Sequence, residues 1–222
     1  MGVRDQAMKT SKGGLRTALD HAAASLAPRN VLVQRGPVTG RRVALTFDDG
    51  PDELTTAYLD MLDRLAVRAT FFLVGQMCLE SPDGLREIVA RGHEVASHGH
   101  THKTFPRLTA RELSAELAAV KELLPPPERR RPLLRPPHGA VSPASLLRCA
   151  AAGYTTVLWS LDSDDCRTTS PEAVAARVAE STAGEIVLLH EGQQWTIDAL
   201  PAIVGNLRDA GFEIVTVGEM LA

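Results

Sequence analysis

The feature that most constrains the fold of this chain is a regular alternation of short apolar runs with longer segments of helical period. From Arg41 onwards, seven runs rich in β-branched or aromatic residues alternate with six segments whose apolar residues recur at helical spacing. This alternation predicts parallel strands joined by helices, which build either a barrel or a doubly wound sheet. The period of the pattern does not distinguish between these two folds.

The expected elements can be bounded by residue. The predicted strands are Val43–Phe47, Ala69–Val74, Glu94–Ser97, Leu133–Arg135, Thr155–Trp159, Ile186–Leu189 and Glu213–Val217. The predicted helices are Asp52–Leu65, Asp83–Ala90, Thr109–Leu123, Ser142–Ala151, Ser170–Ser181 and Thr196–Ala210. Several helices begin with capping signatures, such as Thr109 followed by Glu112, and Pro171 at a first helical position.

A length of 222 residues suits one α/β barrel, so a single domain is expected. We assign this domain to residues 41–222. Residues 1–40 show no clear period and end in a stretch punctuated by Gly36, Pro37 and Gly40, which is typical of an N-terminal arm or an extra helix.

The sequence gives no clear targeting signal. No apolar segment is long enough to span a bilayer. The stretch from Thr17 to Pro28 is interrupted by Asp20 and His21, so it makes a poor signal-peptide core. We therefore expect a cytoplasmic enzyme, and export would require an unconventional signal.

Composition and missing motifs exclude several functional classes. The 24 Lys and Arg residues against 27 Asp and Glu residues give a net charge of −3, which argues against a general nucleic-acid binder. Three widely spaced cysteines, Cys78, Cys149 and Cys166, suit neither a disulfide scaffold nor a cysteine-built zinc site. Neither a GxGxxG fingerprint nor a P-loop follows the first strand, so nucleotide binding is not expected.

Titratable or charged side chains follow five of the seven predicted strands at their carboxyl ends. Barrel enzymes and open α/β sheets place their active sites at this end. The convergence is the strongest argument for catalysis that the residues alone provide. The side chains concerned are Asp48, Asp49, His98, His100, His102, Arg135, Asp162, Asp164, Asp165 and His190.

Each of these motifs also has a purely structural interpretation. The run Asp48–Pro51 favours a turn followed by a helix cap, and a pair such as His98 and His102 is common on protein surfaces. A zincin-type HExxH site is excluded because Gly99 follows His98. Taken together, one Asp and two His form a ligand set with coordination positions left open for water and substrate.

Four motifs occur in a fixed order along the chain. They are Thr46-Phe47-Asp48-Asp49-Gly50-Pro51, His98-Gly99-His100-Thr101-His102, Arg135-Pro136-Pro137-His138-Gly139 and Leu188-Leu189-His190. In this combination they resemble the polysaccharide deacetylase family, the NodB-homology domain of carbohydrate esterase family 4, which includes chitooligosaccharide and peptidoglycan deacetylases. The likeness covers about residues 41–220, and the first two motifs are the most specific. The fold it implies is an α/β distorted (β/α)7 barrel of the NodB-homology type.

The resemblance implies a metal centre and a catalytic pair. Asp49, His98 and His102 match the metal ligands of the family, Asp48 matches its catalytic base and His190 its catalytic acid. Because imidazole suits zinc and its transition-metal neighbours, the expected cofactor is Zn²⁺, with Co²⁺ or Ni²⁺ as alternatives.

Further residues would support this pair or contact the substrate. Arg135 resembles the arginine that braces the base, and Asp165 best fits the carboxylate that tunes the acid, with Asp162 as the alternative. The backbone N–H of His138 falls where the family has its oxyanion donor. His138, together with Cys166 and Trp195, is also predicted to contact the substrate.

Three residues depart from the family pattern. His138 stands where an aromatic residue is usual, Cys166 where a tryptophan commonly walls the substrate groove, and Glu191 where an aspartate commonly follows the acid. None of these departures touches the metal ligands or the catalytic pair. The missing tryptophan leaves the size of the substrate open.

The expected function is a metal-dependent deacetylase, a hydrolase of carbon–nitrogen bonds other than peptide bonds, that cleaves the amide of an N-acetylated sugar. A metal-activated water would attack while Asp48 takes a proton and His190 protonates the leaving amine. One alternative is a cytoplasmic hydrolase of a small non-sugar N-acyl amide or cyclic imide. Another is a non-catalytic carbohydrate-binding module, which would be expected to have lost Asp48 or His190.

Overall fold

The computed structural model describes residues 28–127 and 131–222. Its centre is a nine-stranded sheet in the order β1-β6-β5-β4-β3-β2-β8-β7, with β9 also paired to β2, and every pairing is parallel. The strands are β1 (Leu32–Val33), β2 (Arg42–Asp48), β3 (Thr70–Leu73), β4 (Glu94–Ser97), β5 (Leu133–Leu134), β6 (Thr155–Val157), β7 (Leu161–Asp162), β8 (Ile186–His190) and β9 (Glu213–Val215).

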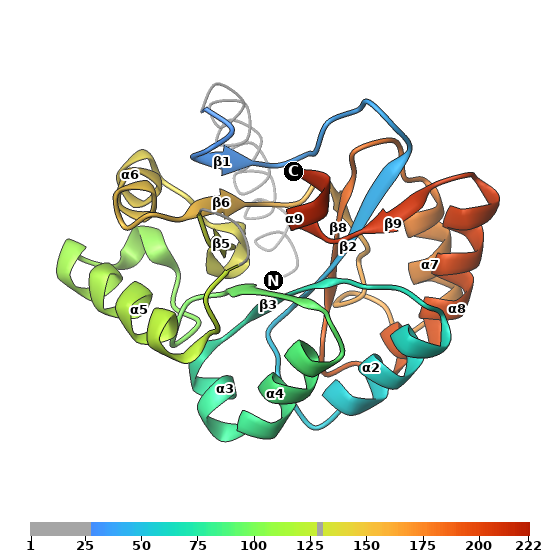
Figure 1. Ribbon diagram of the computed structural model, residues 1–222, viewed down its shortest axis with the longest axis horizontal. Coiled ribbons are helices and arrows are strands. Elements are labelled where there is room, and N and C mark those ends of the chain that lie inside the picture. Colours follow the sequence, from blue (N-terminus) through green and yellow to red (C-terminus); the bar gives the residue numbers. More distant parts are fainter. Residues whose placement is uncertain (1–27, 128–130) are drawn as a thin grey trace, which may run out of the picture.

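Helices surround the curled sheet on its outer side (Figure 1). They are α2 (Thr55–Arg64), α3 (Gly75–Glu80), α4 (Pro82–Ala90), α5 (Ala110–Leu123), α6 (Pro143–Ala151), α7 (Pro171–Ala179) and α8 (Gln194–Asp209). The short helix α9 (Val217–Met220) packs instead against the inner face of the sheet, through Val217 and Met220 (Figure 1). Within the described residues the outermost strands, β1 and β7, do not pair with each other, so the barrel stays open. This arrangement agrees with the predicted distorted barrel and not with a doubly wound sheet.

Strand β2 shows how the sequence separates the two faces of the sheet. Val43, Leu45 and Phe47 pack into the main core between the sheet and helices α2, α7 and α8. Ala44 belongs to a smaller cluster inside the curl. Because side chains alternate along a strand, Thr46 and Asp48 follow Ala44 on the inner face. The carboxyl end of β2 therefore directs polar groups into the barrel.

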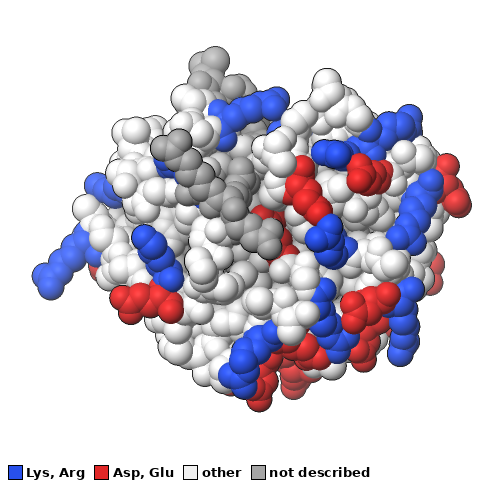
Figure 2. Space-filling model, in the orientation of Figure 1, with Lys and Arg blue, Asp and Glu red and all other residues white. Residues whose placement is uncertain are grey.

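Charged side chains of both signs are interspersed on the face of the molecule drawn in Figure 2. Ion pairs among the described residues show the same mixing, and Arg91 pairs with Asp60, Asp63 and Glu87. Such mixing fits the small net charge and offers no basic surface for nucleic acid on this face. In the described part of the chain, no helix has the length and apolar character needed to cross a membrane.

The structure adds short elements that the sequence pattern did not predict. These are β1, β7, α3 and α9. Two-residue strands such as β1 and β7 are too short to carry a period of two. Helix α9 begins at Val217, which was expected to be the last residue of the final strand. Short apolar runs of this kind are ambiguous between helix and strand.

The boundary of the predicted N-terminal arm differs from the observed one. Residues 1–27 of that arm lie outside the described residues. Leu32 and Val33, which the arm was expected to include, pair in parallel with Thr156 and Val157 of β6. The sheet therefore begins before residue 41, because this buried Leu-Val pair adds to the edge of β6.

Candidate active site

Asp48 and Arg135 form an ion pair inside the carboxyl end of the barrel. Asp48 ends β2 and Arg135 follows β5, and their exposed fractions are 3% and 0%. Arg135 donates from Nη1 to Asp48 Oδ1 at 2.6 Å and to the Thr46 hydroxyl at 2.8 Å. The guanidinium also lies over the ring of Phe72, at 4.0 Å from its centroid. These contacts fix the Asp48 carboxylate and leave its second oxygen facing His98, 3.6 Å from Nε2.

Asp49, His98 and His102 converge beside this pair. The Oδ1 atom of Asp49 lies 3.0 Å from His102 Nε2 and 3.5 Å from His98 Nε2. One potential ligand atom from each residue lies within 4.8 Å of the others. Their donor set, two imidazole nitrogens and one carboxylate oxygen, is one that binds zinc in proteins. The three residues therefore fit a divalent metal ion.

The hydrogen bonds of His98 favour the tautomer that a metal ligand needs. Its Nδ1 lies 2.8 Å from the carbonyl oxygen of Arg135, so Nδ1 carries the proton and Nε2 keeps a free lone pair. Burial lowers the pKa of His98, which keeps the ring neutral. Burial alone would raise the pKa of Asp49, but the hydrogen bond from His102 and the neighbouring histidines lower it to about 2. An ionised carboxylate and a neutral imidazole are the forms that bind metal.

Backbone conformation turns these side chains toward one another. Asp49 has φ of 80° and His102 has φ of 55°, values in the left-handed region that non-glycine residues adopt only at a cost. The loop that carries His102 is held by Glu116 of α5, whose carboxylate accepts the N–H groups of His100 and Thr101 at 2.8 Å each. Sequence reasoning did not identify Glu116, and its only signal is a carboxylate at a buried position of a helix.

His100 belongs to the same motif but not to the same cluster. Its Nδ1 lies close to Gly75, where a Cβ atom would approach to 2.4 Å. Nδ1 of His100 is buried and has no hydrogen-bond partner among the described residues. His100 thus contacts the start of α3, while His98 and His102 turn toward Asp49.

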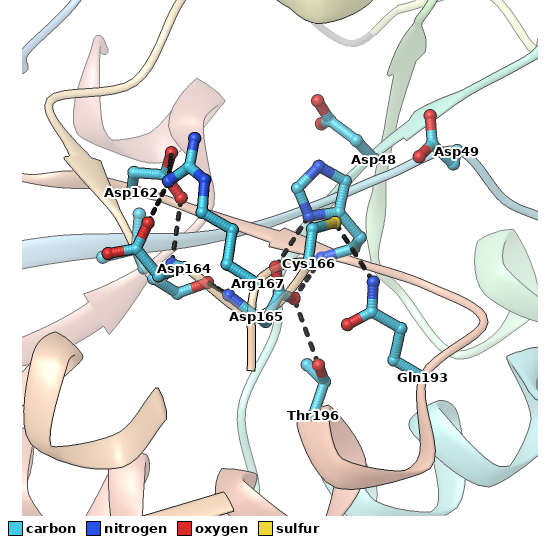
Figure 3. Close-up of polar contacts among 12 residues, drawn as sticks. Asp48, Asp49, Asp162, Asp164, Asp165, Cys166, Arg167, Gln193 and Thr196 are labelled. Carbon is cyan, nitrogen blue, oxygen red and sulfur yellow. Dashed lines mark hydrogen bonds and ion pairs between the residues drawn. The ribbon is translucent and has the colours of Figure 1, made fainter. Parts of the chain in front are cut away.

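On the other side of Asp48, His190 is paired with Asp165 and not with Asp162. Asp165 is fully buried, and its Oδ1 accepts from His190 Nδ1 at 2.8 Å while its Oδ2 accepts the His190 backbone N–H at 2.8 Å. Thr196 donates to the same Oδ2 at 3.1 Å. Figure 3 shows Asp162 beside Arg167, with which it forms an ion pair.

The environment of His190 favours its cationic form. Burial alone would lower its pKa, but hydrogen bonds to Asp165 and Cys166 and the negative charges of Asp165 and Asp48 raise it to about 11. His190 is the last residue of β8, next to Asp48 in the register of the sheet. The arrangement therefore places a protonated imidazole and a carboxylate at the ends of adjacent strands.

The predicted substrate contacts lie in three different settings. His138 is exposed, has φ of 59°, and packs edge-on against His102 with ring centroids 4.6 Å apart. Cys166 is exposed and accepts a hydrogen bond from Gln193 Nε2 at 3.1 Å (Figure 3). Trp195 is half-buried against the main core, and its indole N–H donates to the Asp165 carbonyl at 2.8 Å. The polar group of Trp195 is thus used to hold Asp165.

Glu191, which departs from the family pattern, fills a buried space behind the site. Its exposed fraction is 4%, and Oε1 accepts from the Thr55 hydroxyl at 2.7 Å. Oε2 has no partner among the described residues and lies where a Cβ on Gly50 would be, at 1.5 Å. Burial raises the pKa of Glu191 to about 8. The site therefore contains a neutral carboxylic acid behind the turn that follows Asp49.

Comparison with known proteins decides the family. The family model described as polysaccharide deacetylase matches residues 35–157. The chain belongs to the polysaccharide deacetylase family. Three predictions from the sequence are thereby confirmed: the family, the barrel fold and the enzyme class. The class is that of hydrolases acting on carbon–nitrogen bonds other than peptide bonds.

Several relatives of this chain are named for sugar N-deacetylation. It is 32% identical over 203 residues to a peptidoglycan-N-acetylglucosamine deacetylase of Bacillus cereus, covering 88% of this chain and 95% of the relative. It is 35% identical to a chitooligosaccharide deacetylase of Bradyrhizobium, covering 81% and 90%. It spans 42% of the length of a 31% identical peptidoglycan-N-acetylglucosamine deacetylase of Listeria monocytogenes.

A solved structure of a peptidoglycan N-acetylglucosamine deacetylase in complex with 4-naphthalen-1-yl-N-oxidanyl-benzamide has a similar fold. Its TM-score is 0.82 at 29% sequence identity, and the match covers 86% of this chain and 93% of that one. The predicted deacetylase activity is confirmed at the level of the family, while the role of each residue stays a prediction.

The assignment of the metal ligands can be tested by replacing each of two histidines of one motif, in separate variants, with alanine. His102→Ala should lose stoichiometric metal, because the His102 ring lies 3.0 Å from Asp49, whereas His100→Ala should retain it. Elemental analysis after dialysis measures both variants. A metal-free His100→Ala protein beside a metal-loaded His102→Ala protein would show that the ligand assignment is wrong.

The buried Glu191 predicts a pH-dependent stability. The unfolded residue ionises near pH 4.5 and the folded one near pH 8, so the unfolded state binds fewer protons in this window. The free energy of unfolding should fall as the pH rises through the window, by up to about 1.4 kcal/mol per pH unit, and then level off. Glu191→Gln should remove this slope in urea titrations of chelator-treated protein, whereas Glu→Gln at the exposed Glu53 should keep it. Parallel curves for the parent and Glu191→Gln would contradict the prediction.

Proposed function

We propose that this chain hydrolyses the N-acetyl group of N-acetylglucosamine units in an oligosaccharide or cell-wall glycan. The observation that carries the proposal is the placement of Asp48 and His190 at the ends of adjacent strands, beside a three-residue metal site. The names of the relatives from Bacillus cereus and Bradyrhizobium support the same substrate class. The presence of both Asp48 and His190 argues against a non-catalytic binding module.

Asp49, His98 and His102 would hold the metal, and we propose zinc because its protein sites commonly combine imidazole and carboxylate ligands. When bound there, a divalent ion would lower the pKa of a coordinated water and polarise the acyl oxygen. The three protein ligands leave a fourth position open, as catalytic zinc sites do.

Asp48 is positioned to act as the general base. Arg135 occupies Oδ1, so Oδ2 is the oxygen that faces the metal ligands and can take a proton from the attacking water. Because Arg135, which is itself bound to Thr46, fixes the carboxylate, the acceptor oxygen is already ordered before the reaction.

His190 is positioned to act as the general acid. The Asp165 carboxylate binds Nδ1 and raises the pKa of the ring, so that the imidazolium is available at neutral pH to protonate the leaving amine. Since Nδ1 is bound to Asp165, Nε2 is the atom that transfers the proton. Trp195 and Thr196 hold Asp165 in turn, through its carbonyl and carboxylate oxygens.

The backbone N–H of His138 is proposed to stabilise the oxyanion. The following N–H groups, of Gly139 and Ala140, donate to the carbonyls of Pro136 and Pro137, whereas the His138 N–H has no acceptor within the described residues. An aimed backbone donor of this kind contributes ~3–4 kcal/mol to transition-state stabilisation.

The exposed thiol of Cys166 favours a more open substrate groove than a tryptophan would leave. A smaller N-acyl compound is therefore the second candidate substrate. The cytoplasmic location stays a prediction.

Acetate release from a panel of N-acetylated sugars and small amides tests the proposal. Chelation should abolish activity and one equivalent of Zn²⁺ should restore it, with the highest kcat/KM on N-acetylglucosamine oligomers. Asp48→Asn and His190→Ala should keep the metal yet lose at least about 100-fold in kcat, the lower end of a general acid–base contribution. Wild-type turnover in either variant would refute the mechanism, and absence of acetate release from every compound would refute the function.

The pH profile tests the role of Asp165. His190 must be protonated to act as the acid, so activity is lost as the pH rises through its pKa. Asp165→Asn removes the negative charge that raises this pKa, and the alkaline limb of kcat should move to lower pH. Asp162→Asn is the matched control, because Asp162 pairs with Arg167 instead. A limb that moves in Asp162→Asn and not in Asp165→Asn would reverse the assignment.

A further inference from the structure

A second set of metal-binding side chains lies on the acid side of the site. Asp165, Cys166 and His190 each offer one donor atom, and these atoms all lie within 4.8 Å of one another. The set shares no residue with the Asp49, His98 and His102 site. A carboxylate oxygen, a thiol sulfur and an imidazole nitrogen are the three donor types that zinc uses in proteins.

The spacing of these donors is close to that of ligands around one ion. His190 Nδ1 and Asp165 Oδ1 are 2.8 Å apart and share a proton. Two ligand atoms bound to a tetrahedral zinc at 2.0–2.1 Å are about 3.3 Å apart. Replacing the shared proton by an ion therefore requires a shift of about half an ångström between these two groups.

Access to the second set is through Cys166. Asp165 is fully buried and His190 is partly buried, whereas the thiol is exposed. The sulfur is a hydrogen-bond partner of His190, and it also accepts a hydrogen bond from the side-chain amide of Gln193, which would turn aside when an ion binds (Figure 3). The nearby cation, Arg167, is paired with Asp162 and Asp164 on the same loop. The positive charge of Arg167 is therefore neutralised by carboxylates that are not ligands of the proposed site.

We propose that Asp165, Cys166 and His190 form a second, inhibitory site for Zn²⁺. Binding releases the proton of the thiol and the Nδ1 proton of His190, and no electron is transferred. With Nδ1 and Asp165 both on the ion, the imidazole is neutral, and its remaining Nε2 proton is too weakly acidic to be given to the leaving amine. The inhibitory effect rests on the proposed role of His190, while the binding of the ion does not.

Cobalt is the probe for the binding, because thiolate ligation gives Co²⁺ a charge-transfer absorption in the near ultraviolet. Chelator-treated parent protein should bind two equivalents of Co²⁺ and develop this absorption, which added Zn²⁺ should remove. Cys166→Ser should bind one equivalent and lack the absorption. The other two cysteines, Cys78 and Cys149, are buried and do not contribute.

Asp164→Asn is the matched control, since it removes a carboxylate from the same loop and asparagine tolerates the left-handed conformation of Asp164, with φ of 58°. This variant should still bind two equivalents with the thiolate absorption. A parent protein that binds one equivalent without the absorption would overturn the site. Two equivalents in Cys166→Ser would also overturn it.

Activity tests the inhibition separately. Each protein is assayed at one equivalent of Zn²⁺ and again at saturating Zn²⁺, and the ratio is compared. In the parent, kcat at saturating Zn²⁺ should be about 100-fold lower than kcat at one equivalent, as expected for loss of a general acid. In Cys166→Ser the two values should differ by less than about twofold. An unchanged ratio in a parent that binds two ions would overturn the inhibition. If no compound is hydrolysed at one equivalent, the proposed function fails, and the cobalt titration still decides whether the second site exists.

Discussion

The ion pair between Arg135 and Asp48 is the interaction on which the active site depends. A fully buried guanidinium must find acceptors, and losing one partner of such a pair typically costs about 3–5 kcal/mol. Its side chain binds Asp48 and Thr46 of β2, and its carbonyl oxygen accepts from Nδ1 of His98. Arg135 therefore fixes both the carboxylate of Asp48, the proposed base, and the tautomer of His98, a proposed metal ligand.

Two consecutive carboxylates perform different tasks because the chain changes conformation between them. Asp48 is the last residue of β2 and points into the barrel, where Arg135 holds it. Asp49 has a left-handed backbone with φ of 80°, which turns its carboxylate toward His98 and His102. Gly50 leaves room behind this turn for the neutral Glu191. Different surroundings of this kind are what separate the roles of neighbouring carboxylates in enzymes.

The sequence was sufficient to predict the site residues that lie at the carboxyl ends of strands. It was not sufficient to identify the supporting residues whose role depends on contacts between segments far apart in the chain. Asp48, His98, Arg135 and His190 were expected to converge because parallel strands bring their carboxyl ends to one edge of a barrel, and their separate roles came from the resemblance of their motifs to the family. The choice between Asp162 and Asp165 needed the loop after β7, a strand too short to leave a periodic signal. Glu116 of α5, which supports the loop that carries His102, was missed because glutamate is usually exposed on a helix and only its spacing from the apolar residues of α5 indicates burial. The same limit applies to Trp195, whose indole holds Asp165.

The two proposed catalytic groups are braced by charges of opposite sign, and this asymmetry determines what else each can bind. Asp48 is held by a buried cation, which repels other cations and uses one of its oxygens. His190 is held by a buried anion, which raises its pKa and also attracts metal ions. Position 166, where the family commonly has a tryptophan, directly follows that anion in the chain. The thiol found there adds a zinc ligand instead, so the contact that makes His190 a good acid also exposes it to inhibition by metal.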